Sequence, residues 1–455
     1  MRKQRRKFLA GILAMLMVST AALTGCQGNT QQPEPSSSGE SPVSSENTEE
    51  KKISGDLEIQ IFVGGYGETF WNEQIESFKE KYPEVNIIKQ MGSQINEQMK
   101  TRWISGDAPD LVYVDGPEMP QALPQLIADG KIMDLKSFFD TAKDENGGLI
   151  KDNLVGGVLR EQDGKIYQAP YIFNTWGMWY NEKLLADNGI ELPTGFDSFV
   201  EAGRQLKEKG IADLCYTGVY ANYLVRGTLL AGVASEGGQQ IMDDIYDLKE
   251  GVFQTDAFKN AVSKIKTLAD EGLIMDGCVA LNHTESQMEW LKGSAAFIPN
   301  GLWLESEMKD DIPSDFQMRF IPSVLQDDGE KMVLLPDSFG FAVSANTKNP
   351  DAALAFLQHL YREDASKRFV ELTNTPCVYN VDTSSLNISE AIKSVQNYLT
   401  DPNVTFITKK ASDITPEVET ELQNCLNSLI QGNLTVDELC DRVEQAAKLA
   451  RESAE

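Results

Sequence analysis

Apolar residues follow two different rhythms along the body of the chain. In the run 57–63 apolar residues first alternate with polar ones and then follow one another, which predicts a strand. Over 70–82 they recur every three or four positions, which predicts a helix with one apolar face. The order then repeats as a strand over 85–88, a helix that carries Trp103 and a strand over 111–114. Alternating strands and helices predict mainly parallel sheets that bind ligands at the carboxyl ends of their strands.

The same two patterns continue through the rest of the chain. Helices are expected to begin near Glu182 and to run over 193–206, and strands are expected over 295–298 and 336–344. In the run 284–287 a threonine and a glutamine stand three residues apart, which is the spacing of a capping box. Two further helical patterns close the chain, and no internal repeat is present. The order of elements fits an α/β protein.

The first 25 residues have the pattern of a secretory signal peptide. A basic run over 2–7 leads into an apolar run over 8–23, which is short for a membrane-spanning helix of about 20 residues. The ending Leu23-Thr24-Gly25-Cys26 resembles the lipobox of bacterial lipoproteins, in which cleavage leaves a cysteine that carries lipid. We therefore expect residues 1–25 to be removed and Cys26 to become a lipidated N-terminus on the outer face of a membrane. A retained helical anchor is the alternative.

Residues 26–52 are expected to form a flexible tether. They are rich in serine, proline and glutamate and contain almost no large apolar side chain, so they cannot bury enough surface to offset the entropy of ordering. The body that follows has about 400 residues, enough for two large lobes. Such a chain works outside the cytoplasm, close to a membrane partner.

The chain is strongly acidic. It has 69 Asp and Glu against 41 Lys and Arg, a formal net charge of −28, and removal of the signal peptide would make it more negative. This charge disfavours nucleic acid and anionic lipid headgroups as partners, and it favours a neutral or cationic ligand.

The sequence does not predict a metal site or a cofactor. Cysteine is sparse, with no Cys-x-x-Cys spacing, and His283 and His359 are the two histidines. Five cysteines follow Cys26, so at least one thiol stays free if the others pair. Cys425 and Cys440 could bridge neighbouring helices, although buried thiols are the simpler interpretation.

Short runs spread over the whole body resemble the solute-binding lipoproteins of bacterial carbohydrate ABC transporters, a family that includes maltose-binding proteins. Each run is weak alone, but together they stand in family order behind the lipobox and tether. The runs are Phe70-Trp71-Asn72 with Tyr82-Pro83, then 105–110, 170–181, 291–303, 347–350 and 432–435.

The resemblance implies a periplasmic-binding-protein-like fold with two α/β lobes and a ligand cleft between them. We expect lobe one to comprise 53–172 plus 322–374, and lobe two 175–320 plus 377–455. The chain would cross between the lobes at 171–176, 320–325 and 373–377. The protein would be a monomer that binds a sugar by hinge closure and delivers it to ABC permease subunits. It would not be an enzyme.

A sugar site needs aromatic rings for the apolar faces of the sugar and amide or carboxylate groups for its hydroxyls. Trp303 is the first choice because the family places a tryptophan at this point, beside Asn300. Asn174 and Trp176 lie in the first crossing, and maltose-binding proteins carry a glutamate at the position that matches Asn174. The weaker candidates, which have ordinary turn or packing roles as alternatives, are Tyr66, Asp115, Asp337, Phe339 and, after the run 217–219, either Tyr220 or Tyr223.

Two other functions compete with sugar binding. The same fold could bind a peptide or polyamine, whose cationic groups would suit an acidic protein and whose binding would weaken strongly with salt. A secreted glycoside-active enzyme is less well supported, because no acid/base motif, nucleophile elbow or metal-ligand cluster is recognisable.

Overall fold

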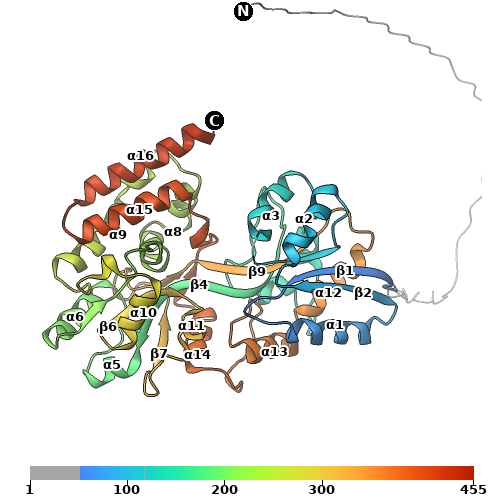
Figure 1. Ribbon diagram of the computed structural model, residues 1–455, viewed down its shortest axis with the longest axis horizontal. Helices are drawn as coiled ribbons and strands as arrows, with labels where there is room; N and C mark the ends of the chain where they lie inside the picture. Colours follow the sequence, from blue (N-terminus) through green and yellow to red (C-terminus); the bar gives the residue numbers. More distant parts are fainter. Residues whose placement is uncertain (1–51, 117, 455) are drawn as a thin grey trace, which may run out of the picture. The chain divides into compact units, whose positions relative to one another are not determined.

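The computed structural model describes residues 52–116 and 118–454 of the chain (Figure 1). The predicted signal peptide, the lipidation site at Cys26 and the tether up to residue 51 lie outside the described residues. Among the residues that are described, no helix is both long and apolar enough to cross a membrane.

Two sheets share one long strand, β4. The first sheet has the order β2-β1-β3-β9-β4. β1 is parallel to β2 and β3, whereas β9 is antiparallel to both β3 and β4. The strands are β1 (Gly55–Phe62), β2 (Val85–Gly92), β3 (Leu111–Val114), β9 (Pro336–Val343) and β4 (Ala169–Asn181).

The second sheet is built on the other half of β4. β6 and β7 pair antiparallel with its two edges, and β5 lies parallel to β6. A separate pair of short strands, β8 and β10, is parallel. The strands are β5 (Ala212–Leu214), β6 (Ala295–Gly301), β7 (Met318–Ile321), β8 (Met332–Leu334) and β10 (Val404–Phe406).

The α/β class is confirmed, but the strand pairing is mixed rather than mainly parallel. The part of the first sheet that is built from successive strand–helix units, β2-β1-β3, is parallel as the sequence pattern predicts. The strand β9 instead enters the first sheet from the second lobe, β4 leaves the first sheet toward that lobe, and both run antiparallel to their neighbours.

Helices cover the faces of both sheets, because each has one apolar face. In α1, for example, Phe70, Trp71, Ile75 and Phe78 are buried. The helices of the first lobe are α1 (Thr69–Lys81), α2 (Ile95–Ser105), α3 (Met119–Ala128), α4 (Lys136–Thr141), η1 (Ile150–Asn153), α12 (Pro350–Leu360) and α13 (Glu363–Thr373).

The second lobe contains more helices, and β4 reaches from the first group to the second (Figure 1). They are α5 (Glu182–Asp187), α6 (Phe196–Glu208), α7 (Asn222–Leu224), the π-helical η2 (Val225–Leu229), α8 (Leu230–Tyr246), η3 (Val252–Gln254), α9 (Asp256–Asp270), η4 (Cys278–Ala280), α10 (His283–Leu291), α11 (Leu304–Met308), α14 (Glu390–Leu399), η5 (Ala411–Asp413), α15 (Pro416–Ile430) and α16 (Val436–Ala454).

The tryptophans of the helices are core residues. Trp71 packs against Tyr113 and Phe341, with ring centroids 5.1 Å and 5.4 Å away, and Trp103 is buried between α2 and its neighbours. Trp290 of α10 is fully buried and donates its indole N–H to the carbonyl of Ala296 at 3.0 Å. Trp71 and Trp290 therefore have no surface free for a ligand.

The capping box of α10 stands two residues before the predicted one. Asn282 accepts a hydrogen bond from the Glu285 N–H at 3.0 Å, and Glu285 accepts one from the Asn282 N–H at 3.0 Å. The prediction of Thr284 and Gln287 was wrong, because the extended backbone that an N-cap requires lies at Asn282.

The second passage between the sheets comes later in the chain than the expected 320–325. Val324 and Leu325 lie in the core of the second lobe, and Lys264 of α9 donates to the Leu325 carbonyl at 2.6 Å. The chain joins the first sheet only at Pro336, where β9 begins. The segment 322–335, which was expected in lobe one, thus packs with lobe two.

The third passage is also shifted. The run 377–380, expected in lobe two, pairs with the first lobe: the Val378 N–H donates to the Tyr171 carbonyl at 2.9 Å, and the Asn380 N–H donates to the Asn153 carbonyl at 2.9 Å. The chain reaches the second lobe at α14, which packs against β7.

A buried carboxyl in β5 gives a test of this core. Asp213 is fully buried, neither of its carboxyl oxygens has a hydrogen-bond partner among the described residues, and burial raises its pKa well above the ordinary value. An unfolded Asp ionises near pH 3.9, so the unfolded state binds fewer protons above that pH and stability falls as pH rises. We predict that Asp213→Asn, which cannot ionise, gains roughly 1–3 kcal/mol over the wild type between pH 4 and pH 7.

Urea unfolding at both pH values measures this difference. Glu208→Gln is the control, because Glu208 is an exposed carboxylate on the neighbouring α6. An Asp213→Asn variant whose stability relative to the wild type is the same at pH 4 and pH 7 would contradict the prediction.

Candidate functional site

The candidate site lies where β4 changes from one sheet to the other. Thr175 is the last residue of β4 that pairs with β9, and Trp176 is the first that pairs with β6. Asn174 stands opposite Asp337 in the β4–β9 ladder. Asn174 and Trp176 are two positions apart, so their side chains leave the same face of the strand. The pairing therefore brings a polar group and an aromatic ring together at the crossing.

Asp337 is the centre of a polar group on the side of the first sheet. The Ser338 N–H donates to Asp337 Oδ1 at 2.7 Å, and Lys410 Nζ lies 3.0 Å from the same oxygen. The Ser412 hydroxyl donates to Oδ2 at 3.5 Å. This mostly buried carboxylate is held by an ion pair and two hydrogen bonds, which fixes its orientation.

Tyr66 and Asp115 belong to the same polar group, because the charges of Asp115 and Asp337 both act on Tyr66. Burial raises the pKa of Tyr66 far above its ordinary value, and the negative charges of Asp115 and Asp337 raise it further, so both carboxylates lie near its hydroxyl. Burial also raises the pKa of Asp115, whose Oδ1 accepts a hydrogen bond from the Gly116 N–H at 2.6 Å. The Tyr66 hydroxyl therefore keeps its proton at neutral pH.

Basic side chains balance these acids. Arg160 donates to the Pro336 carbonyl next to Asp337, and burial lowers the pKa of its guanidinium against the effect of Asp337 and Asp413. Burial raises the pKa of Asp413, and Lys410 opposes that rise. The polar group thus combines carboxylates with cations and does not present a purely acidic surface.

Three aromatic rings form the side of the site that belongs to the second sheet. The Trp176 ring lies 4.8 Å from Trp303 and 4.9 Å from Tyr223, with interplanar angles of 86° and 89°. Trp303 and Tyr223 stay partly exposed, whereas Trp176 is mostly buried. Burial and the Glu307 carboxylate raise the pKa of Tyr223 to about 12, so its hydroxyl keeps its proton at neutral pH. We call Trp176, Trp303 and Tyr223 the aromatic trio.

Gly301 lets Trp303 fold back over the end of β6. A Cβ atom at this position would lie 2.0 Å from the Trp303 ring, closer than any real contact. The backbone of Gly301 also accepts a hydrogen bond from the Trp179 indole at 3.0 Å. Only a residue without a side chain allows this arrangement, so the glycine of the run 300–303 positions its tryptophan.

A nearly buried ion pair packs against Trp176 of the trio. Arg226 of η2 makes two hydrogen bonds to the Glu419 carboxylate of α15, at 2.6 Å and 2.7 Å. The guanidinium carbon lies 5.3 Å from the centre of the Trp176 ring, which is a cation–π geometry. The bidentate pair fixes the guanidinium over the ring.

Three of the predicted residues make different contacts. Asn300 is buried, and its side chain accepts a hydrogen bond from the Gly301 N–H at 2.8 Å, so it caps the strand end. Phe339 stands opposite Ile172 in the first sheet and packs on the core there. Tyr220 is 51% exposed, and its carbonyl accepts a hydrogen bond from the Tyr223 N–H at 3.1 Å, so it lies at the rim of the trio.

Sequence reasoning missed the residues that support the site. Arg160, Lys410 and Asp413 meet Asp337 from segments far away in sequence, and Arg226 and Glu419 are 193 positions apart. Tyr223, by contrast, was predicted as the alternative to Tyr220, and its ring is the one that packs against Trp176.

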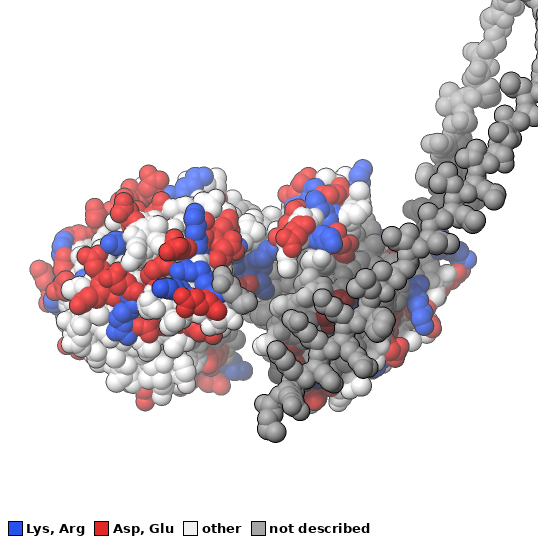
Figure 2. Space-filling model, turned by 90° about the horizontal axis from the view of Figure 1, so that it is seen from above, with Lys and Arg blue, Asp and Glu red and all other residues white. Residues whose placement is uncertain are grey.

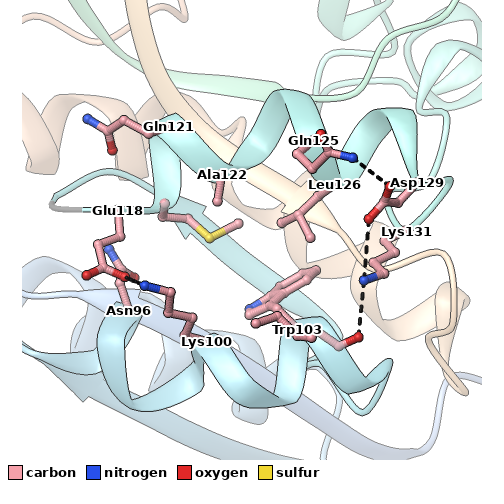
Figure 3. Close-up of a pocket in the computed structure, with 12 residues that line it drawn as sticks. Asn96, Lys100, Trp103, Glu118, Gln121, Ala122, Gln125, Leu126, Asp129 and Lys131 are labelled. Atoms are coloured by element: carbon pink, nitrogen blue, oxygen red, sulfur yellow. Dashed lines mark hydrogen bonds and ion pairs between the residues drawn. The ribbon is translucent and has the colours of Figure 1, made fainter. Parts of the chain in front are cut away.

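Apart from the candidate site, the first lobe has a hollow between α2 and α3 (Figure 3). It has a volume of about 660 Å³, an apolar floor that includes Trp103, Ala122 and Leu126, and ion pairs at its rim such as Lys100–Glu118 at 3.1 Å. Asn96 connects it to the candidate site, because its side chain donates to the Asp115 carbonyl at 2.8 Å. The ring faces and carboxylates of the candidate site are absent from its lining.

The surface of the described body carries both signs of charge. Figure 2 shows acidic side chains over much of the face seen from above, with basic side chains between them. In the described ranges 52–116 and 118–454, no group of three or more His, Cys, Asp or Glu side chains is arranged to hold a metal ion.

The chain is similar to known proteins over most of its length. Residues 64–367 match the model of a family described as bacterial extracellular solute-binding protein. The diacetylchitobiose binding protein NgcE of Streptomyces coelicolor is 24% identical over 381 residues, which cover 82% of this chain and 80% of that protein. The maltodextrin-binding protein MdxE of Bacillus subtilis is 26% identical over 321 residues, which cover 68% of this chain and 70% of that protein.

Solved structures share the fold. A probable secreted solute-binding lipoprotein from Streptomyces coelicolor aligns with a TM-score of 0.70 at 19% identity and covers 86% of this chain and 98% of that one. The apo form of RafE from Streptococcus pneumoniae aligns with a TM-score of 0.68 at 16% identity and covers 86% and 97%. At these identities the likeness concerns the fold alone.

The close contact at Gly301 leads to a direct test of the trio. We predict that Gly301→Ala displaces the Trp303 ring, because its Cβ would overlap the indole. The near-ultraviolet circular dichroism and tryptophan fluorescence should change, with a loss of about 1–3 kcal/mol in stability from overpacking.

Gly92→Ala is the matched control, because a Cβ at Gly92 would meet no atom within 4 Å. The prediction fails if Gly301→Ala and Gly92→Ala give the same spectra and the same unfolding free energy as the wild type.

Proposed function

The chain belongs to the family of bacterial extracellular solute-binding proteins, and from this premise we propose that it captures a sugar or oligosaccharide outside the cytoplasm and delivers it to an ABC import permease. The observation that carries the proposal is the aromatic trio next to the polar group around Asp337. A sugar offers apolar C–H faces and a ring of hydroxyls, and these need both kinds of surface at one place.

The two sides of the site would have different roles. Trp303 and Tyr223 would stack on the faces of the sugar ring. Trp176, which contacts both rings, would hold them in position. Asn174, Asp115, Asp337 and Tyr66 would bind the hydroxyls, since amide, carboxylate and phenol groups can donate or accept hydrogen bonds there. Tyr220 at the rim could contact a longer ligand.

The names of the relatives favour an oligosaccharide. One relative binds diacetylchitobiose and another binds maltodextrin, according to their names. Asn174 stands where maltose-binding proteins carry a glutamate, so the hydroxyl pattern that is recognised here should differ from that of maltose. An amide offers both a donor and an acceptor, whereas a carboxylate only accepts.

A peptide or polyamine is disfavoured by the charges at the site. Asp337 already pairs with Lys410, and Glu419 already pairs with Arg226. A cationic ligand would have to displace these internal cations or stay near Arg160. A neutral ligand meets no such cost, because the carboxylates are compensated before it arrives.

Capture would use closure of the two lobes around the ligand. β4 joins the lobes at Thr175 and Trp176, and the residues that would bind the ligand come from both sheets. Ligand bound to both sides would stabilise the closed form, and this form would be the one that the permease recognises. The protein itself would have no catalytic role and would act as a monomer.

The N-terminal features support anchoring. With residues 1–25 removed, lipid on Cys26 would attach the protein to the extracytoplasmic face of the membrane, and the tether up to residue 52 would let the body reach the permease. These residues lie outside the described part of the chain.

The stacking role leads to a binding prediction. We predict that Trp303→Ala weakens sugar binding at least tenfold, which corresponds to about 1.4 kcal/mol, because the exposed ring supplies the stacking surface. The measurement is a thermal-shift screen of the full-length protein against mono- and oligosaccharides, followed by calorimetric titration of each hit. Ligand at 100 times its dissociation constant should stabilise the wild type by roughly 2.7 kcal/mol.

Leu449→Ala, at an exposed apolar position on α16, is the control for truncation. Peptides and polyamines are tested in parallel, at low and high salt. If a polyamine stabilises the protein only at low salt and no sugar does so, the proposal of a sugar ligand is wrong. The assignment of the fold would not be affected.

The anchor is tested by a separate variant. We predict that Cys26→Ala leaves the protein unlipidated and shifts it from the membrane to the soluble fraction of a bacterial host, because one acyl-carrying residue provides the attachment. Mass spectrometry of the N-terminus, together with fractionation, measures this. A Cys26→Ala protein that stays in the membrane fraction would instead favour the retained helical anchor.

A further inference from the structure

Two buried cysteines of the second lobe lie in contact. Cys215 directly follows β5 and Cys278 begins η4, and their sulfur atoms are 3.8 Å apart. Both side chains are almost fully buried. The other cysteines of the body are not paired in this way: Cys377 donates to the Tyr379 carbonyl at 3.2 Å, and Cys425 donates to Glu421 at 3.4 Å. All five cysteines among the described residues are free thiols.

The backbone around the pair is already aligned. The Gly218 N–H donates to the Cys278 carbonyl at 2.9 Å, and the Tyr216 N–H donates to the Cys278 sulfur at 3.4 Å. A disulfide has a sulfur–sulfur distance of about 2.05 Å, so closure requires the sulfurs to approach by less than 2 Å. Rotation of the two side chains can supply this, because hydrogen bonds already hold the two segments side by side.

A surface cavity leads to the pair. It has a volume of about 410 Å³, and Cys278 is one of its lining residues together with Met275, Val279 and Gln431. A small oxidant in the cavity reaches Cys278, and the almost fully buried sulfur has to turn toward the cavity to react. Cys278 lines this cavity and Cys215 does not, which favours Cys278 as the thiol that meets the oxidant first.

We propose that Cys215 and Cys278 form an oxidisable pair that closes to a disulfide in the extracytoplasmic environment. The oxidant is a disulfide of low molecular mass, RSSR. The Cys278 thiolate attacks one sulfur of RSSR and releases RS⁻, which takes up the proton that Cys278 lost. Cys215 then loses its proton and attacks the Cys278 sulfur, which releases a second RSH. Two thiols are oxidised to one disulfide, and RSSR is reduced to two RSH.

The bond would fasten together the two segments that lead to the aromatic trio. The chain continues from Cys215 through Thr217 to Tyr223, and from Cys278 to His283, whose ring lies 5.2 Å from Tyr223. Thr217 already donates to the Leu281 carbonyl at 3.1 Å. A disulfide at the base of these segments reduces the freedom of the unfolded chain over the enclosed loop and stabilises the lobe. This inference does not rest on the identity of the ligand.

The test treats the full-length protein with oxidised glutathione and then alkylates it under denaturing conditions. We expect two fewer alkylated cysteines, a cross-linked peptide pair that contains Cys215 and Cys278, and a rise in Tm of about 5 °C that dithiothreitol reverses. Cys215→Ala and Cys278→Ala should each abolish the shift, whereas Cys377→Ala should keep it.

Three outcomes would overturn the proposal. The first is full alkylation of both cysteines after oxidation. The second is a bridge between other cysteines, such as Cys425 and Cys440. The third is a glutathione adduct on Cys278 that never resolves to the internal disulfide. Because peptide mapping reads the bond directly, the wild type decides the question even if a variant folds poorly.

Discussion

The pairing of β4 is the constraint on which the rest of the structure depends. All of its residues are buried, so each backbone group needs a partner within the protein. β9 supplies partners as far as Thr175, and β6 and β7 supply them beyond it. The change of partner occurs between adjacent residues, and Pro336, which has no N–H, begins β9 at that point. The crossing is thus a continuous strand that is paired on both sides of the change of partner.

This arrangement explains why the candidate site combines two kinds of surface. The polar side chains come from strand ends of the first sheet, where Asp115 follows β3 and Asp337 is the second residue of β9. The aromatic side chains come from the second lobe, where Trp303 follows β6. Because β4 contributes Asn174 to one group and Trp176 to the other, its register fixes their separation.

The sequence predicted those parts of the structure that depend on local patterns. The strands 57–63 and 111–114, the amphipathic helix over 70–82 and the core positions of Trp71 and Trp103 follow from periodicity and burial. Trp303 and Trp176 followed from residue type and motif, and the structure places these two rings 4.8 Å apart. The sequence offered either Tyr220 or Tyr223 as a further site residue, and the structure places the Tyr223 ring against Trp176.

Features that depend on register or on distant partners could not be predicted. Asn300 is a polar residue near a strand end, but its side chain turns onto its own backbone. Arg226 and Glu419 meet only because α15 packs against η2. The second crossing was placed too early, since Val324 and Leu325 are as apolar as a strand but pack in the lobe-two core. The sequence at the start of α10 also contains two possible capping boxes, one at Asn282 and one at Thr284. The extended backbone at Asn282 makes that residue the N-cap.

The pleat of β4 limits how this binding surface can diverge. Side chains alternate between its faces, so inserting or deleting one residue between Asn174 and Trp176 would turn one of them to the opposite face and break the pairing beyond it. Point substitutions leave that alternation intact, and length changes in the loops that carry Tyr66, Tyr220 and Trp303 do so too. New specificities in such a scaffold would therefore arise by exchanging side chains on a strand of constant length and by remodelling the surrounding loops.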